Sequence, residues 1–215
     1  MTVAPDADWS SATVYVVGGG PSLLPWKSHL DDLPARGIVV GVNQSALEVA
    51  GCHALYTQDR RFYARIEKSG RLAQMVSSGT RIAIARRPGS LWAADMIRGA
   101  EHLDLVEPPA ERGPGAIVQG LHSGHGALQW VILQGARDIV LLGYDLRPLG
   151  KGEVTRWNAG AMWAPKSDEV NWGRWVREMA SIPIPGGVRV RNANPESAVK
   201  CFPCTTYAEE FECGR

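Results

Sequence analysis

The chain has 215 residues, of which 45% are hydrophobic and 21% are charged, a composition that is ordinary for a globular protein and excludes a wholly disordered chain. Its formal net charge of +1 gives no overall attraction to nucleic acid or to an acidic membrane surface. No apolar run approaches the roughly 20 residues of a membrane-spanning helix, and the N-terminus has no signal-peptide pattern. We therefore expect a cytoplasmic protein with one domain over residues 1–215.

Short apolar runs rich in β-branched residues recur along the chain and predict strands. They occupy residues 13–17, 37–42, 53–57, 80–85, 102–106, 138–143 and 187–192. Most of them are continuous rather than alternating, as expected for strands covered on both faces.

Helical patterns separate several of these runs, at residues 24–33, 123–136 and 169–182. The alternation predicts an α/β fold, a single Rossmann-like domain with a mostly parallel sheet and helices on both faces. Residues 147–168 carry no predicted element, and a loop of this length is a candidate lid.

The first predicted strand ends in "VVGGGPSL", where Pro21 and Ser22 open the next helix and Ser22 is its candidate N-cap. A dinucleotide fingerprint would have a glycine in place of Leu23 and an acid in place of Asn43. Glycines in such a turn present N–H groups to a phosphate or a ribose, or they simply form a tight turn without a ligand. The glycines are Gly18, Gly19 and Gly20.

A second helix start, "LHSGHGALQW", places Ser123 and Gly124 where backbone N–H groups are free to meet an anion. His125 follows in the first turn. It is a candidate base, although a histidine at a helix start also serves as an ordinary cap or surface residue.

Two acids follow predicted strands, Asp59 and Asp145. Ligands of an open parallel sheet bind beyond the carboxyl ends of the strands, so either acid can contact a ribose, hold a metal or act as a base. Helix capping, or pairing with the neighbouring Arg60 and Arg147, is the alternative.

Cationic and aromatic side chains gather in and beside the candidate lid. Arg147, Arg156 and Trp157 can contact a phosphate or an acceptor. Alternatively, the tryptophans anchor the lid to the sheet.

The order of the motifs is more informative than any one of them. "VVGGGPSL", "GVNQSA", "ALYTQD", "SGHGALQWVILQGARDIVLLGYDL" and "VRNANPESAV" follow one another in a layout that resembles the Campylobacter-type bacterial sialyltransferases. It is similar also to their wider family of archaeal 6-hydroxymethylpterin diphosphokinase-like, motility accessory and phage proteins. The resemblance covers nearly the whole chain.

This resemblance implies a nucleotide-sugar donor of the cytidine type. The nucleotide contacts that it implies are Gly18, Gly19, Gly20, Ser22, Asn43, Gln58 or Asp59, Ser123 and Gly124, with Pro21 in the same turn and with Asp145 and Asn194 near the site. The sialyltransferases carry a general-base histidine in the lid, whereas "EVTRWNAGAMWAP" contains no histidine. The candidates for that role are then Asp145, Asp59, His125, His122 and Asp168.

Three hypotheses follow from these residues. The leading one is a nucleotide-dependent transferase, in the simplest case glycosyltransferase-like, with a small-molecule nucleotide ligand and no nucleic-acid partner. A diphosphokinase-like enzyme would instead use ATP and a magnesium ion held by Asp59 and Asp145. A non-catalytic nucleotide-binding accessory protein, as among the phage members of that wider family, is the third.

Overall fold

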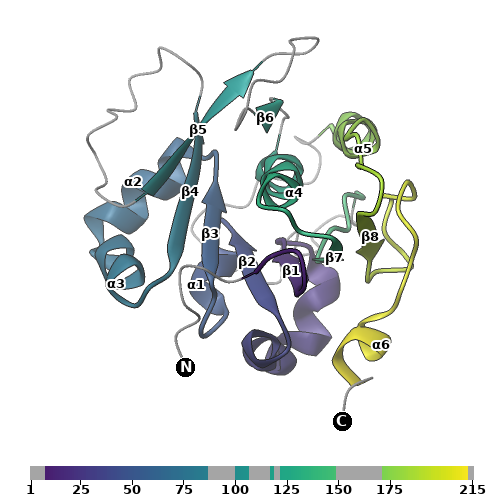
Figure 1. The fold of residues 1–215 in the computed structure, drawn as a ribbon, viewed down its shortest axis with the longest axis horizontal. Coiled ribbons are helices and arrows are strands. Elements are labelled where there is room, and N and C mark those ends of the chain that lie inside the picture. Colours follow the sequence, from purple (N-terminus) through teal and green to yellow (C-terminus); the bar gives the residue numbers. More distant parts are fainter. Residues whose placement is uncertain (1–7, 87–99, 107–116, 119–121, 149–170, 213–215) are drawn as a thin grey trace.

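The centre of the molecule is an eight-stranded sheet with the order β6-β5-β4-β3-β2-β1-β7-β8 (Figure 1). The computed structural model describes residues 8–86, 100–106, 117–118, 122–148 and 171–212. The strands are β1 (Thr13–Val17), β2 (Ile38–Val42), β3 (Ala54–Thr57), β4 (Arg81–Arg86), β5 (Ala100–Val106), β6 (Ile117–Val118), β7 (Asp138–Leu142) and β8 (Arg189–Asn192). Each of these neighbouring pairs is parallel.

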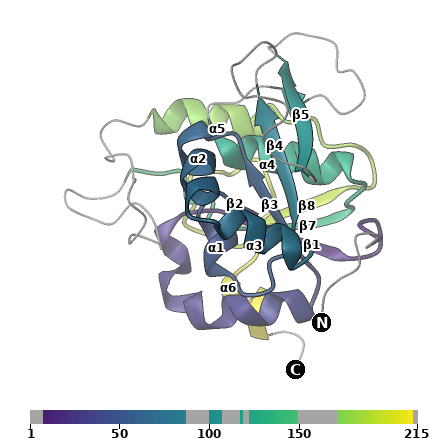
Figure 2. The same ribbon diagram turned by 90° about the vertical axis from the view of Figure 1, so that its left-hand side faces the viewer.

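Helices cover both faces of this sheet (Figure 2). They are η1 (Pro21–Ala35), α1 (Ser45–Glu48), α2 (Arg60–Lys68), α3 (Arg71–Ser77), α4 (Ser123–Leu133), α5 (Trp172–Ala180) and α6 (Tyr207–Glu212). Val14 and Val16 of β1 pack in one core cluster with α4 and α5, while Tyr15 and Val17 pack in another with η1 and α6. The predicted Rossmann-like α/β fold is thus confirmed.

Every predicted strand is present, with bounds that differ by no more than about two residues from the apolar run. The two-residue strand β6 was not predicted, because so short a segment has no detectable pattern. The predicted helices correspond to η1, α4 and α5, whereas α1, α2, α3 and α6 were missed.

The first predicted helix differs in kind from the expectation. η1 is a 3₁₀ helix with Pro25 and Pro34 inside it, and a proline has no N–H to continue an α-helical ladder. Its N-cap is Gly20 rather than Ser22. The greater part of the candidate lid, residues 149–168, lies outside the described residues.

The chain order creates one topological switch point. From β1 the chain moves outward through β2 to β6, and then returns to place β7 on the other side of β1. Val17 is in register with Leu142, so Gly18 and Gly143 leave the sheet side by side. Ligands of open α/β sheets bind at such a point, so we expect a ligand site at the carboxyl ends of β1 and β7. No helix in the described part of the chain is long and apolar enough to cross a membrane.

Candidate functional site

The glycine turn packs directly against the end of β7. The N–H of Gly18 donates to the carbonyl of Leu142 (2.7 Å), and the N–H of Gly20 donates to the carbonyl of Gly143 (2.8 Å). A β-carbon on Gly18 would lie 2.8 Å from the Gly143 oxygen, which is too close for any real side chain. The expectation that Gly18 and Gly20 offer bare N–H groups to a phosphate is therefore wrong.

Asp145 is buried at the switch point and holds three segments together. Ser22 Oγ donates to its Oδ2 at 2.8 Å, and Asn194 Nδ2 donates to its Oδ1 at 2.9 Å. Burial raises the pKa of Asp145, while the hydrogen bonds from Ser22 and the charge of Arg147 oppose that rise. The structure thus brings together Ser22, Asp145 and Asn194, which the sequence had assigned to one site.

Tyr207 also belongs to this cluster, although no sequence motif predicted it. Its hydroxyl oxygen accepts from the N–H of Gly143 (3.0 Å) and lies 2.6 Å from Ser22 Oγ. A detectable signal was present, because Thr206 and Glu209 form a capping box that marks the start of α6.

Asn43 joins the ends of β2 and β3 to the start of α4. Its Oδ1 accepts from Thr57 Oγ1 at 2.7 Å, and its Nδ2 donates to Ser123 Oγ at 3.1 Å. Its backbone has a φ of 54°, in the left-handed region that asparagine tolerates better than most residues. Gln58 approaches the same group, with its backbone nitrogen 3.5 Å from Ser123 Oγ.

α4 begins at Ser123, as predicted, and His122 is its N-cap. His122 Nδ1 accepts from the N–H of His125 (3.3 Å), and the imidazole of His122 stacks on Trp175 with centroids 4.9 Å apart. The N–H groups of Ser123 and Gly124 have no acceptor within the helix, since they precede its first hydrogen-bonded turn. Burial, assisted by nearby His125, lowers the pKa of His122 to about 3, so the imidazole is neutral at pH 7.

Tyr144 connects the glycine turn to α4. Its hydroxyl donates to the carbonyl of Gly124 (3.1 Å), and a β-carbon on Gly124 would lie 2.9 Å from its ring. On the other side, a β-carbon on Gly18 would lie 3.2 Å from the same ring. Tyr144 therefore links the carboxyl ends of β1 and β7 to the N-terminus of α4.

Asp59 serves as a helix cap. It is the N-cap of α2, where its Oδ1 accepts from the N–H groups of Arg61 (2.9 Å) and Phe62 (3.2 Å). Because β2 and β1 separate β3 from β7, the ends of β3 and β7 lie about 14 Å apart at about 4.8 Å per strand. Asp59 and Asp145 follow these two separate strand ends, and each carboxylate accepts hydrogen bonds from its own neighbours.

The other predicted residues divide between described and undescribed parts of the chain. His125 is buried, with its Nδ1 3.1 Å from Gln129 Nε2. Arg147 lies beside Asp145 and pairs with Glu196 at 2.9 Å. Arg156 and Trp157 lie outside the described residues. The described residues contain no group of three or more His, Cys, Asp or Glu side chains that could hold a metal ion.

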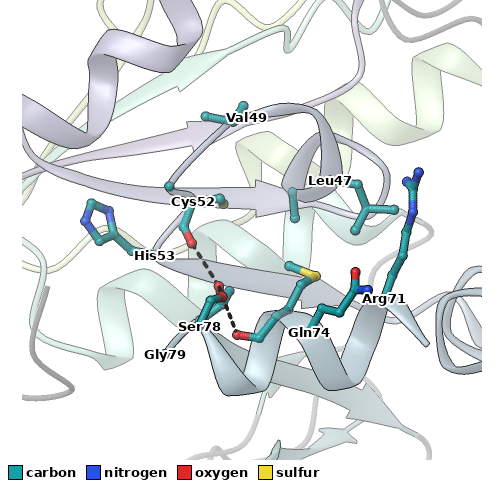
Figure 3. Close-up of a pocket in the computed structure, with 12 residues that line it drawn as sticks. Leu47, Val49, Cys52, His53, Arg71, Gln74, Ser78 and Gly79 are labelled. Atoms are coloured by element: carbon teal, nitrogen blue, oxygen red, sulfur yellow. Dashed lines mark hydrogen bonds between the residues drawn. The ribbon is translucent and has the colours of Figure 1, made fainter. Parts of the chain in front are cut away.

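A cavity of about 560 Å³ lies elsewhere, between α1, α3 and the turns before β3 and β4 (Figure 3). Cys52 and His53 border it on one side and Arg71 and Gln74 on the other. Burial raises the pKa of Cys52 to about 12, so its thiol is protonated and not nucleophilic at neutral pH. The turns in its wall precede β3 and β4, so the cavity lies near the amino ends of these strands, whereas the switch point lies at the carboxyl ends of β1 and β7.

Comparison with known proteins supports the fold. No protein-family model and no curated protein matches the sequence. Among solved structures, the fold is similar to that of the MAf glycosyltransferase from Magnetospirillum magneticum AMB-1, with a TM-score of 0.54 and 11% sequence identity. The match covers 95% of this chain and 35% of that one, so this chain spans about a third of the length of that structure. At this identity the likeness concerns the fold alone.

Proposed function

We propose that the chain is a nucleotide-dependent transferase, in particular a glycosyltransferase-like protein that binds a nucleotide-sugar donor at the switch point. One observation carries the proposal: polar residues from the ends of β1, β2, β3 and β7 converge with the N-terminus of α4, and Tyr144 joins them into one site. The similar fold of a solved glycosyltransferase is consistent with it.

The donor phosphates would lie against α4. The first N–H groups of that helix, at Ser123 and Gly124, have no partner within the helix, and its dipole favours a negative charge there. His122 is neutral at pH 7, so the favourable field at this helix end comes from the helix dipole alone. Asn43, next to Ser123, would contact the nucleoside. The same groups would stabilise the charge on the departing nucleotide phosphate.

Asp145 is the candidate general base. Burial raises the pKa of Asp145, and an ionised carboxylate has lone pairs besides those that accept from Ser22 and Asn194. In the proposed step, an acceptor hydroxyl transfers its proton to Asp145 as its oxygen bonds to the anomeric carbon. The bond between that carbon and the phosphate oxygen breaks, and the nucleotide leaves with the electron pair.

A nucleotide-binding accessory protein without turnover is the second candidate. It is favoured by one observation: Asp145 is only 4% exposed, and both of its oxygens already accept hydrogen bonds within the protein. The diphosphokinase-like alternative receives no such support, because Asp59 caps α2 at a distance from Asp145.

Binding is tested first, by calorimetric titration with cytidine, uridine and adenosine diphosphates, each with and without Mg²⁺. We expect one nucleotide to bind without a metal requirement, and Asn43→Gly to weaken it at least tenfold. The absence of binding by all three at millimolar concentration would refute the proposal.

Turnover is tested next, with the sugar conjugate of whichever nucleotide binds. We expect Asp145→Asn to abolish release of free nucleotide while binding is kept, and the control Asp59→Ser to leave both unchanged. Wild-type protein that binds the donor and never turns it over, with any acceptor sugar offered, would favour the accessory protein over the enzyme.

A further inference from the structure

The C-terminal helix α6 is fixed to η1 by stacked aromatic rings. Trp26 stacks on Phe211 at 5.7 Å with an interplanar angle of 19°, and His29 stacks on Phe211 at 5.8 Å. The capping box of Thr206 and Glu209 fixes the first turn of α6. Tyr207 lies in that turn, and its hydroxyl contacts Ser22 in the first turn of η1.

The hydrogen bonds that lead from Tyr207 to Asp145 have a definite direction. The N–H of Gly143 can only donate, so the Tyr207 oxygen accepts from it. The single hydroxyl proton of Ser22 points to Asp145 Oδ2. The 2.6 Å contact between the two hydroxyls must then use the proton of Tyr207, which donates to Ser22 Oγ.

We propose that Tyr207 is a positioning residue for the candidate site. By donating a hydrogen bond to Ser22, it orients the Ser22 hydroxyl toward the Asp145 carboxylate, so that Asp145 accepts the last hydrogen bond of the series. The proposal depends on the proposed function for the chemical role of Asp145, but not for the hydrogen-bond chain itself.

Reversal of this chain is disfavoured. A protonated Asp145 would donate to Ser22, and Ser22 would in turn donate to Tyr207. The Tyr207 proton would then lose its acceptor, and the contacts described around Tyr207 supply no other. A buried hydroxyl without a partner is costly, so the native arrangement favours an ionised Asp145.

Few other groups act on the ionisation of Asp145. Arg147, from its own segment, lowers the pKa, and Arg147 is itself paired with Glu196. Asn194, from the turn after β8, is an uncharged donor. The backbone N–H groups of Ser22 and of Asp145 itself also lower the pKa, and side-chain substitutions leave them in place. The Ser22 hydroxyl, with Tyr207 behind it, is the part that a conservative substitution can remove.

The test is a ¹³C NMR titration of the Asp145 side-chain carboxyl in the ligand-free protein. We expect Tyr207→Phe to raise its pKa by roughly half a unit to one unit, and Ser22→Ala to raise it at least as much. In the Ser22→Ala background, Tyr207→Phe is expected to add no further shift, because its effect passes through Ser22. The control Tyr63→Phe removes a hydroxyl that bonds Glu67 within α2 and is expected to leave Asp145 unchanged.

Equal shifts from Tyr207→Phe in both backgrounds, or no shift in a variant with a native amide spectrum, would overturn the proposal. The titration needs no nucleotide, so its outcome is separable from that of the proposed function. If the protein does transfer a sugar, the acidic limb of its pH profile for kcat is expected to move to higher pH in Tyr207→Phe by the same amount. The KM for the donor is expected to stay unchanged.

Discussion

Gly20 lies so close to Asp145 that a β-carbon on Gly20 would overlap the Asp145 carboxylate. The backbone of Gly20 has a φ of −65°, which any residue adopts, so the glycine is required for space rather than for conformation. An internal carboxylate therefore lies against the third glycine of the "VVGGGPSL" turn, where the sequence motif suggested the anion of a ligand.

Replacing Gly20 with alanine should separate Ser22 from Asp145. We expect Gly20→Ala to destabilise the protein by about 1–3 kcal/mol, the usual cost of overpacking a tight contact. Urea unfolding measures this, with Gly186→Ala as a control, since a β-carbon there meets no atom within 4 Å. The control is expected to change stability by less than about 0.5 kcal/mol. Equal stability of the two variants would contradict the close packing.

The sheet was predictable because a buried parallel strand has a local signature. Runs such as residues 13–17 and 138–143 are continuously apolar and β-branched, and β1 and β7 formed there. α2 was not predicted, although helix capping was one of the two interpretations of its N-cap Asp59. The same carboxylate oxygen that suggested chemistry accepts the first N–H groups of the helix.

The site was predictable only in part, because its decisive contacts join residues far apart in the chain. Ser22 and Asp145 each had a local signal, Asn194 was implied by the resemblance alone, and the structure brings the three together. The use of the Gly18 and Gly20 N–H groups depends on β7, more than 100 residues away, which local patterns do not reveal. Local patterns also do not reveal that the Tyr207 hydroxyl contacts Ser22 Oγ.

Substitution of Asn43 can separate backbone strain from side-chain function. Asn43→Ala removes the contacts to Thr57 and Ser123 and also places an alanine at positive φ, so we expect a loss of about 1–3 kcal/mol. Asn43→Gly removes the same contacts and relieves the strain. It is expected to be more stable than Asn43→Ala in thermal unfolding, yet to bind nucleotide as weakly as Asn43→Ala. Retained nucleotide affinity in both variants would remove Asn43 from the site.

His122 should make the protein sensitive to mild acid. Its pKa in the fold is about 3, below its value of about 6.5 in an unfolded chain, so the unfolded state takes up the proton first. The contribution of the neutral His122 to the free energy of unfolding is complete above about pH 6.5, and it is lost progressively as the pH falls from about 6.5 toward 3.

We expect His122→Asn, which can still cap α4, to flatten the decline of unfolding free energy in that window by up to about 1.4 kcal/mol per pH unit. Urea denaturation at a series of pH values measures the slope. An unchanged slope would show that His122 titrates alike in the folded and unfolded states.

Two substitutions of Asp59 distinguish a role in helix capping from a role in catalysis. Serine also caps helices, so Asp59→Ser should preserve the hydrogen bonds to the start of α2 while removing the carboxylate. Asp59→Ala removes both and is expected to cost about 1 kcal/mol in stability. If Asp59 is a cap alone, Asp59→Ser keeps wild-type stability in urea unfolding, and both variants keep wild-type nucleotide affinity in calorimetry at a temperature where both are folded. A loss of Mg²⁺-dependent nucleotide binding in Asp59→Ser, with stability preserved, would instead restore Asp59 as a metal ligand and reopen the diphosphokinase-like alternative.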